Sequence, residues 1–93
     1  TRNVWIAVCI ACLDRNLTNP RRIVKPTENE LIRVAKKNKW QMNTANNCTE
    51  FLCPNFSAKA VPPTSENCLR AGNFISRFNT DKVLGSIAEV YSI

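Results

Sequence analysis

Ten consecutive apolar residues, 4–13, lie at the start of a chain of only 93 residues. The run is about half the length that a helix needs to cross a bilayer, so a folded protein must bury it as a strand or a helix. Four β-branched residues tip the balance slightly to a strand: Val4, Ile6, Val8 and Ile10. Because Arg2 precedes it, the run also resembles the core of a signal peptide, although no initiator Met and no small-x-small cleavage site precede Asp14. Strand, helix and targeting remnant stay open.

The positive charge is concentrated in the first two-fifths of the chain. The whole protein carries a net charge of +6; residues 1–39 hold nine basic and three acidic side chains, whereas residues 40–93 are neutral. Such a cluster suits an acidic protein surface or a polyanion, and a solvated surface is the plain alternative. The residues expected to contact a partner are Arg21, Arg22, Lys25, Glu30, Arg33, Lys36, Lys37 and Trp40.

Composition argues against an enzyme. The chain has no His, which excludes Ser-His-Asp and Cys-His nucleophiles and a His general base. Glycine occurs only at positions 72 and 85, so no glycine-rich loop can cradle a phosphate. No pair of carboxylates can be assigned to a shared site. We therefore expect a protein that acts by binding, without a cofactor.

Five cysteines in so short a chain favour a secreted domain with disulfides. The disulfide candidates are Cys9, Cys12, Cys48, Cys53 and Cys68, which leave one thiol over. Three glycosylation sequons agree with secretion, at Asn16, Asn47 and Asn55. The alternative is a zinc site made from the two close thiol pairs. It is disfavoured because Cys9 and Cys12 lie inside the apolar run, so no bound metal is expected.

The rest of the chain predicts helices separated by polar segments. Residues 14–26 read as a loop, and Thr27 caps an amphipathic helix over 27–41 with a basic outer face that includes Trp40. Residues 43–47 form a polar linker, and residues 48–60 allow short helical turns on either side of Pro54. A second helix starts at residue 64 or 65. A third runs from Thr80 to Tyr91.

Part of this pattern resembles the interleukin-4-type short-chain helical cytokines. The resemblance lies in Cys48-Thr49-Glu50-Phe51, Pro54-Asn55, Thr64-Ser65-Glu66 and Cys68-Leu69-Arg70-Ala71, with Glu30-Leu31-Ile32 similar to the first helix of that family. It covers about half of the chain, and the first 26 residues have no counterpart. The resemblance implies a helical fold and a receptor contact through Glu30 and Arg33.

A rival resemblance is to the elicitins, secreted helical sterol carriers. It rests on the spacing Cys48-x4-Cys53-x14-Cys68 with prolines before the last cysteine, while the other three cysteines of that pattern are missing. Both resemblances imply a secreted, helical, disulfide-linked protein.

We therefore expect one domain, residues 1–93, that is mostly α: a small disulfide-stabilised helical domain in which residues 4–13 could form one buried strand. The expected function is that of a secreted, basic, cytokine-like glycoprotein that binds a cell-surface receptor, an acidic protein or a polyanion through the first-helix face. No transmembrane segment is expected. The alternatives are an intracellular basic module, with or without zinc, that binds nucleic acid, and a secreted lipid or sterol carrier.

Overall fold

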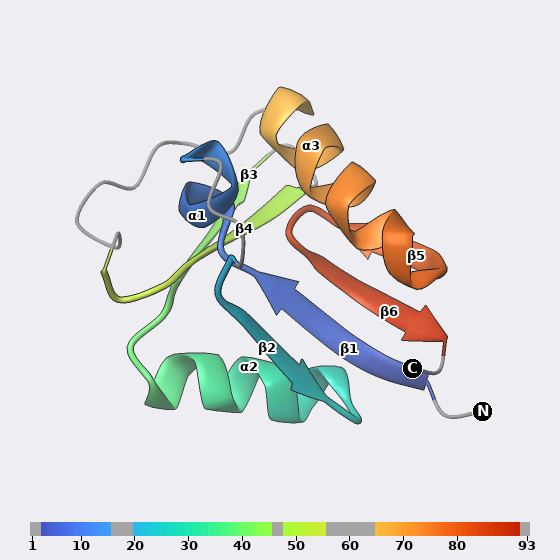
Figure 1. Cartoon of the computed structure of the whole chain (residues 1–93). Coiled ribbons are helices and arrows are strands. Elements are labelled where there is room, and N and C mark those ends of the chain that lie inside the picture. The colour runs from blue at the N-terminus through green and yellow to red at the C-terminus, as the bar shows by residue number, and fades with distance from the viewer. Residues whose placement is uncertain (1–2, 16–19, 46–47, 56–64, 92–93) are drawn as a thin grey trace.

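The computed structural model describes residues 3–15, 20–45, 48–55 and 65–91 (Figure 1). In these residues helices are interspersed among six strands, and the strands form two antiparallel sheets. The elements in chain order are β1 Asn3–Val8, α1 Ile10–Asp14, β2 Arg22–Lys25, α2 Glu28–Lys37, β3 Gln41–Ala45, β4 Cys48–Leu52, α3 Ser65–Ile75, the 3-10 helix η2 Ser76–Phe78, β5 Thr80–Leu84 and β6 Ile87–Tyr91.

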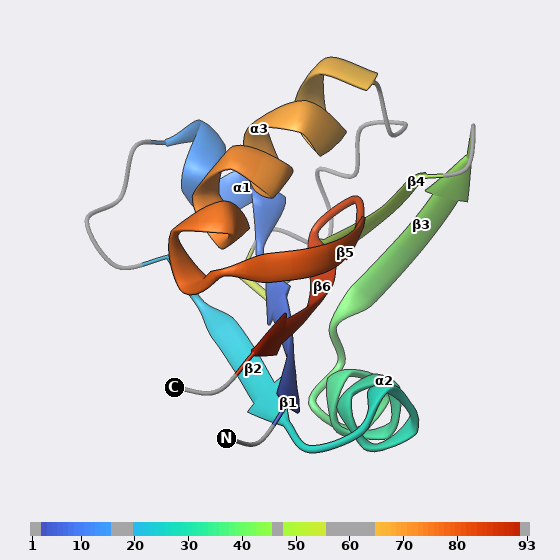
Figure 2. The same cartoon turned by 90° about the vertical axis from the view of Figure 1, so that its right-hand side faces the viewer.

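The larger sheet has the order β2-β1-β6-β5, and helices cover both of its faces (Figures 1 and 2). Successive side chains of β1 point to opposite faces. Ile6 and Val8 pack with α3, whereas Ala7 packs with α2. A strand that is covered on both faces reads as a continuous apolar run rather than as an alternating one. This explains the composition of residues 4–8.

Strands β3 and β4 form a separate hairpin, which is joined to the larger sheet through Ser86 and Phe51. Cys9 and Phe51 form an isolated parallel bridge. The buried Ser86 accepts the Phe51 N–H on its Oγ at 2.6 Å, and its own N–H donates to the Thr49 carbonyl at 2.9 Å. The Val8 N–H donates to the Ser86 carbonyl at 2.8 Å. The turn between β5 and β6 therefore fixes the hairpin against β1.

The fold class expected from the sequence, a mostly helical domain, is wrong. The segment expected to form a third helix, 80–91, is the hairpin β5–β6. Its apolar residues fit a helical period, but Gly85 has φ 70°, a left-handed conformation that ends the first strand in a turn. Two five-residue strands then pair side by side, and Ala88 and Val90 are buried against α3.

Three other expected segments are also strands. Residues 22–25, expected as loop, form the edge strand β2, and the expected linker 43–47 overlaps β3. Residues 48–52, expected as helical turns, form β4. These polar or short stretches pair because a neighbouring strand offers hydrogen bonds, an effect that local propensity does not report. The part of the chain that the structure describes does not have the helical architecture implied by the two family resemblances.

The starts of two predicted helices are confirmed, but the first helix ends at Lys37 and not at residue 41, where β3 has already begun. Helix α2 begins at Glu28, and the Thr27 Oγ1 accepts the Glu30 N–H at 3.2 Å, as its capping role requires. Helix α3 begins at Ser65, as expected. The apolar run 4–13 is split between β1 and α1. Within the described ranges, no helix is long and apolar enough to cross a membrane.

Candidate functional site

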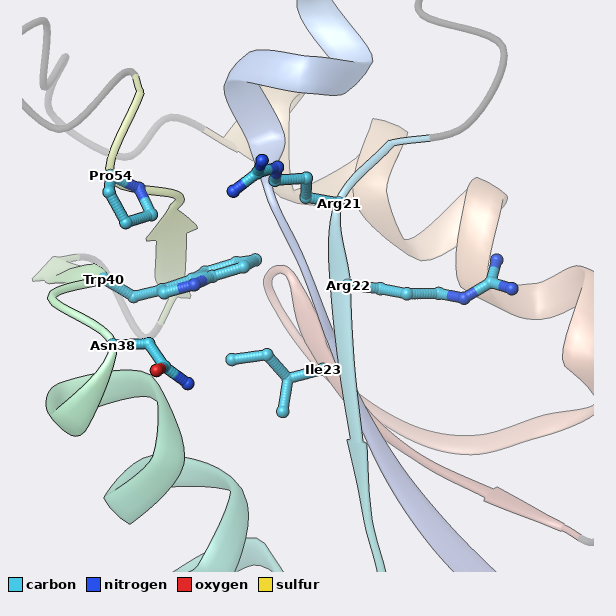
Figure 3. A pocket seen from close by; sticks show the side chains of 6 residues that line it. All are labelled: Arg21, Arg22, Ile23, Asn38, Trp40 and Pro54. Carbon is cyan, nitrogen blue, oxygen red and sulfur yellow. The ribbon is translucent and has the colours of Figure 1, made fainter.

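Arg21, which immediately precedes the edge strand β2, and Arg22, its first residue, point to opposite sides. The backbone carbonyl of Arg21 accepts the Cys9 N–H at 2.9 Å, which holds the start of the strand against the end of β1. Ile23 packs with the α2 cluster, and Arg21 extends over the same face (Figure 3). The Arg22 guanidinium instead lies 5.8 Å from the centre of the Phe78 ring. The strand period therefore separates two neighbouring cations.

The C-terminus of α2 positions Trp40. Lys39 has φ 63°, the Trp40 N–H donates to the Ala35 carbonyl at 2.8 Å, and the Lys39 N–H donates to the Lys36 carbonyl at 3.1 Å. These are the two hydrogen bonds of a Schellman motif, with Lys39 in the left-handed position that glycine usually occupies. The chain turns back at this point. Trp40 is consequently half-buried against the core and does not continue the exposed face of α2.

Replacing Lys39 by Gly should stabilise the protein. The left-handed conformation costs an L-residue roughly 1 kcal/mol, and glycine adopts it freely. We expect the free energy of unfolding to rise by about 0.5 to 1 kcal/mol, because the greater freedom of glycine in the unfolded chain offsets part of the gain. Urea denaturation followed by circular dichroism measures it. Arg33→Gly, at an exposed position in the middle of the helix, is the control and should destabilise by about 1 kcal/mol.

Arg21 and Trp40 line one open pocket between β2, the end of α2 and the segment after β4 (Figure 3). Its volume is about 530 Å³, and its lining residues are Arg21, Arg22, Ile23, Asn38, Trp40 and Pro54. Figure 3 shows the Arg21 side chain on the side of Trp40 and Pro54, while the Arg22 side chain runs away from them. Among the residues that the structure describes, the lining contains cations, an amide and an indole but no carboxylate. Such a pocket suits an anionic ligand with a flat apolar part.

The structure brings only part of the expected partner surface together. Arg21, Arg22 and Trp40 line the pocket. Glu30, Arg33, Lys36 and Lys37 are exposed on the outer side of α2, as the amphipathic pattern predicts, and Lys25 is half-buried on β2. Three further lining residues, Ile23, Asn38 and Pro54, were not expected from the sequence. Asn38 immediately follows the last residue of α2, so a correct prediction of where this helix ends could have identified it.

Three of the five cysteines form a buried thiol cluster. Cys9 follows β1, Cys12 lies in α1 and Cys53 follows β4, and all three are at most 2% exposed. Their sulfur atoms lie within 4.8 Å of one another, and the Sγ atoms of Cys12 and Cys53 are 3.9 Å apart. These are the residues that could hold a metal ion. Burial raises the pKa of the Cys9 thiol to about 12, so in the metal-free protein this thiol stays protonated.

The other two cysteines, Cys48 and Cys68, form a disulfide that joins β4 to α3, with their Cα atoms 6.4 Å apart. Of the three glycosylation candidates, Asn55 is exposed, and Asn16 and Asn47 lie outside the described residues.

A scan against protein-family models and searches of curated proteins and of solved structures found no match to this chain. Function must therefore be argued from the site itself.

Proposed function

We propose that the protein binds RNA, with an unpaired base against Trp40 and the adjoining phosphate on Arg21. The observation that carries this proposal is that a guanidinium and an indole line one open pocket, whose described lining residues include no carboxylate. Arginine binds phosphate through a planar fork of donors, and an aromatic ring stacks on an unstacked base. Proteins recognise RNA sequence mostly at loops and bulges, where bases are unstacked.

The surroundings of the pocket support the same ligand. Arg33, Lys36 and Lys37 are exposed along α2, whose C-terminal end reaches the pocket at Asn38. These three cations would contact the phosphate backbone of a longer RNA, one nucleotide of which occupies the pocket. Because they contact no base, they would add affinity that falls with salt but little sequence preference.

The test is fluorescence anisotropy with a labelled RNA stem-loop, a duplex of the same stem, and heparin. We expect the stem-loop to bind most tightly. Arg21→Gln should weaken binding about tenfold and reduce the slope of log K against log salt by roughly 1. Lys82→Gln, which removes an exposed cation from β5 at the other edge of the sheet, is the control and should change affinity less than twofold.

Two results would contradict the proposal. One is stem-loop binding no tighter than duplex or heparin binding. The other is an equal loss for Arg21→Gln and Lys82→Gln, which would mean that net charge alone attracts the RNA.

A second candidate is the secreted receptor-binding protein, and the Cys48–Cys68 disulfide favours it. Disulfides persist mainly in oxidising compartments. In that case the exposed face of α2 would contact an acidic receptor surface. Reversing Arg33, Lys36 and Lys37 to Glu should abolish binding of the labelled protein to cells, whereas Arg21→Gln should leave it intact. Cell binding that is unaffected by the triple reversal would exclude this candidate. The two arginines in the lining of the pocket disfavour the third candidate, a lipid or sterol carrier.

A further inference from the structure

The thiol cluster brings together residues that are far apart in the sequence. Cys12 and Cys53 are 41 positions apart, and their sulfur atoms lie 3.9 Å from each other. A metal–thiolate bond is about 2.3 Å long, so two thiolates on one tetrahedral ion are roughly 3.8 Å apart. The third sulfur, of Cys9, lies within 4.8 Å of both. Only small movements would place all three on one ion.

The backbone around the cluster holds the sulfur atoms in place. The Cys53 N–H donates to the Cys9 Sγ at 3.2 Å. A donor at a sulfur atom stabilises the thiolate form and belongs to the outer shell that orients metal ligands. The Cys9 N–H in turn donates to the Arg21 carbonyl, which fixes the end of β1. Ala11 and Trp40 pack against the cluster and shield it from water.

We propose that Cys9, Cys12 and Cys53 bind one soft metal ion, Cu⁺ or Zn²⁺, through three thiolates. On binding, three S–H bonds break, three metal–sulfur bonds form, and three protons leave to solvent. No electron is transferred. The sequence-based objection to a metal, that Cys9 and Cys12 lie in an apolar run, does not apply because β1 ends before Cys9 and the chain turns into α1. The third thiol of the site is that of Cys53, so the site does not consist of the two close pairs of cysteines considered from the sequence.

The number of ligands distinguishes the two ions. Among the side chains that the structure describes, the group that could hold a metal consists of these three thiols. Three thiolates suffice for Cu⁺, which is a soft ion. Zn²⁺ would complete its usual four positions with water or an added ligand.

The experiment titrates the full chain under anaerobic conditions with Cu⁺, in competition with bathocuproine disulfonate, and separately with Zn²⁺, in competition with a chromophoric chelator. We expect one ion per chain. At a free-ion concentration a hundred times the Kd, the Tm should rise by about 10 °C or more. If the protein retains Cu⁺ more tightly, the site holds a three-coordinate copper ion. If it binds only Zn²⁺, the site holds a four-coordinate zinc ion. Both results support the site.

Matched variants assign the ligands. Cys12→Ser should lower the affinity at least a hundredfold, whereas Cys48→Ser with Cys68→Ser should still bind one ion. If Cys12→Ser does not fold, the titration of the unaltered protein decides. The proposal is overturned if neither ion changes its Tm, or if intact mass shows a Cys12–Cys53 disulfide and the reduced protein binds no metal. Because no RNA is present, these outcomes are independent of the proposed function.

Discussion

Replacing Gly85 by Ala is expected to lower the free energy of unfolding by about 3 kcal/mol or more, a large part of the 5 to 15 kcal/mol typical of a domain. Gly85 has φ 70°, which costs an L-residue strain, and a Cβ at this position would collide with the backbone of Thr49. The turn cannot move away, because the neighbouring Ser86 is hydrogen-bonded to Thr49 and Phe51. Urea denaturation monitored by circular dichroism measures the loss.

The other glycine is the matched control. A Cβ at Gly72, within α3, would meet only the Val83 Cγ1 at 3.5 Å, an ordinary contact. Gly72→Ala should therefore stabilise the protein by roughly 0.5 to 1 kcal/mol, because alanine is the better helix former. Equal urea midpoints for Gly85→Ala and Gly72→Ala would show that the β5–β6 turn is not packed against β4.

Phe51→Ala should cost about 3 to 5 kcal/mol, the usual range for removing a buried aromatic side chain. Phe51 is 1% exposed and packs with Leu31, Ala35 and Ile87, so it connects β4 to α2 and β6. Chemical denaturation measures the effect, with Leu69→Ala as control. Leu69 is 68% exposed and should change stability by less than about 0.5 kcal/mol.

The consequence of Phe51→Ala for function can be measured separately. Cys53 and Pro54 follow Phe51 closely, so a loosened β4 should also displace one thiol of the cluster and one wall of the pocket. We expect weaker metal and RNA binding in any variant that remains folded. A variant that unfolds at lower urea but binds both ligands normally would mean that Cys53 and Pro54 are held in place without Phe51.

The sequence predicted helices well where a cap and a long amphipathic pattern coincide. Thr27 and the acidic first turn locate α2, and its ten residues provide enough periods to identify the buried side. Residues 80–91 also show apolar residues at helical spacing. In this segment the β-branched residues and Gly85 favour a hairpin. Each strand has only five residues, which is too short for the alternation of apolar and polar residues to distinguish a strand from a helix.

The candidate site could be predicted only in part. Arg21, Arg22 and Trp40 were recognised from charge and aromaticity, but the pocket depends on the left-handed Lys39, which the sequence does not signal by a glycine. The thiol cluster depends on the bridge between Cys9 and Phe51, which brings Cys53 beside Cys9 and Cys12. A contact of this kind is set by tertiary packing and leaves no local pattern.

The basic edge strand has a further consequence, for association between copies of the chain. Among the described strands β2 pairs only with β1, so it forms an edge of the larger sheet, and an edge of this kind can add a strand from another molecule. It is only four residues long, and Pro20 and Pro26 flank it, while Arg21, Arg22 and Lys25 place positive charge along it. Short length, flanking prolines and like charges oppose such pairing. The same cations that suit an anionic ligand thus also protect the sheet from aggregation.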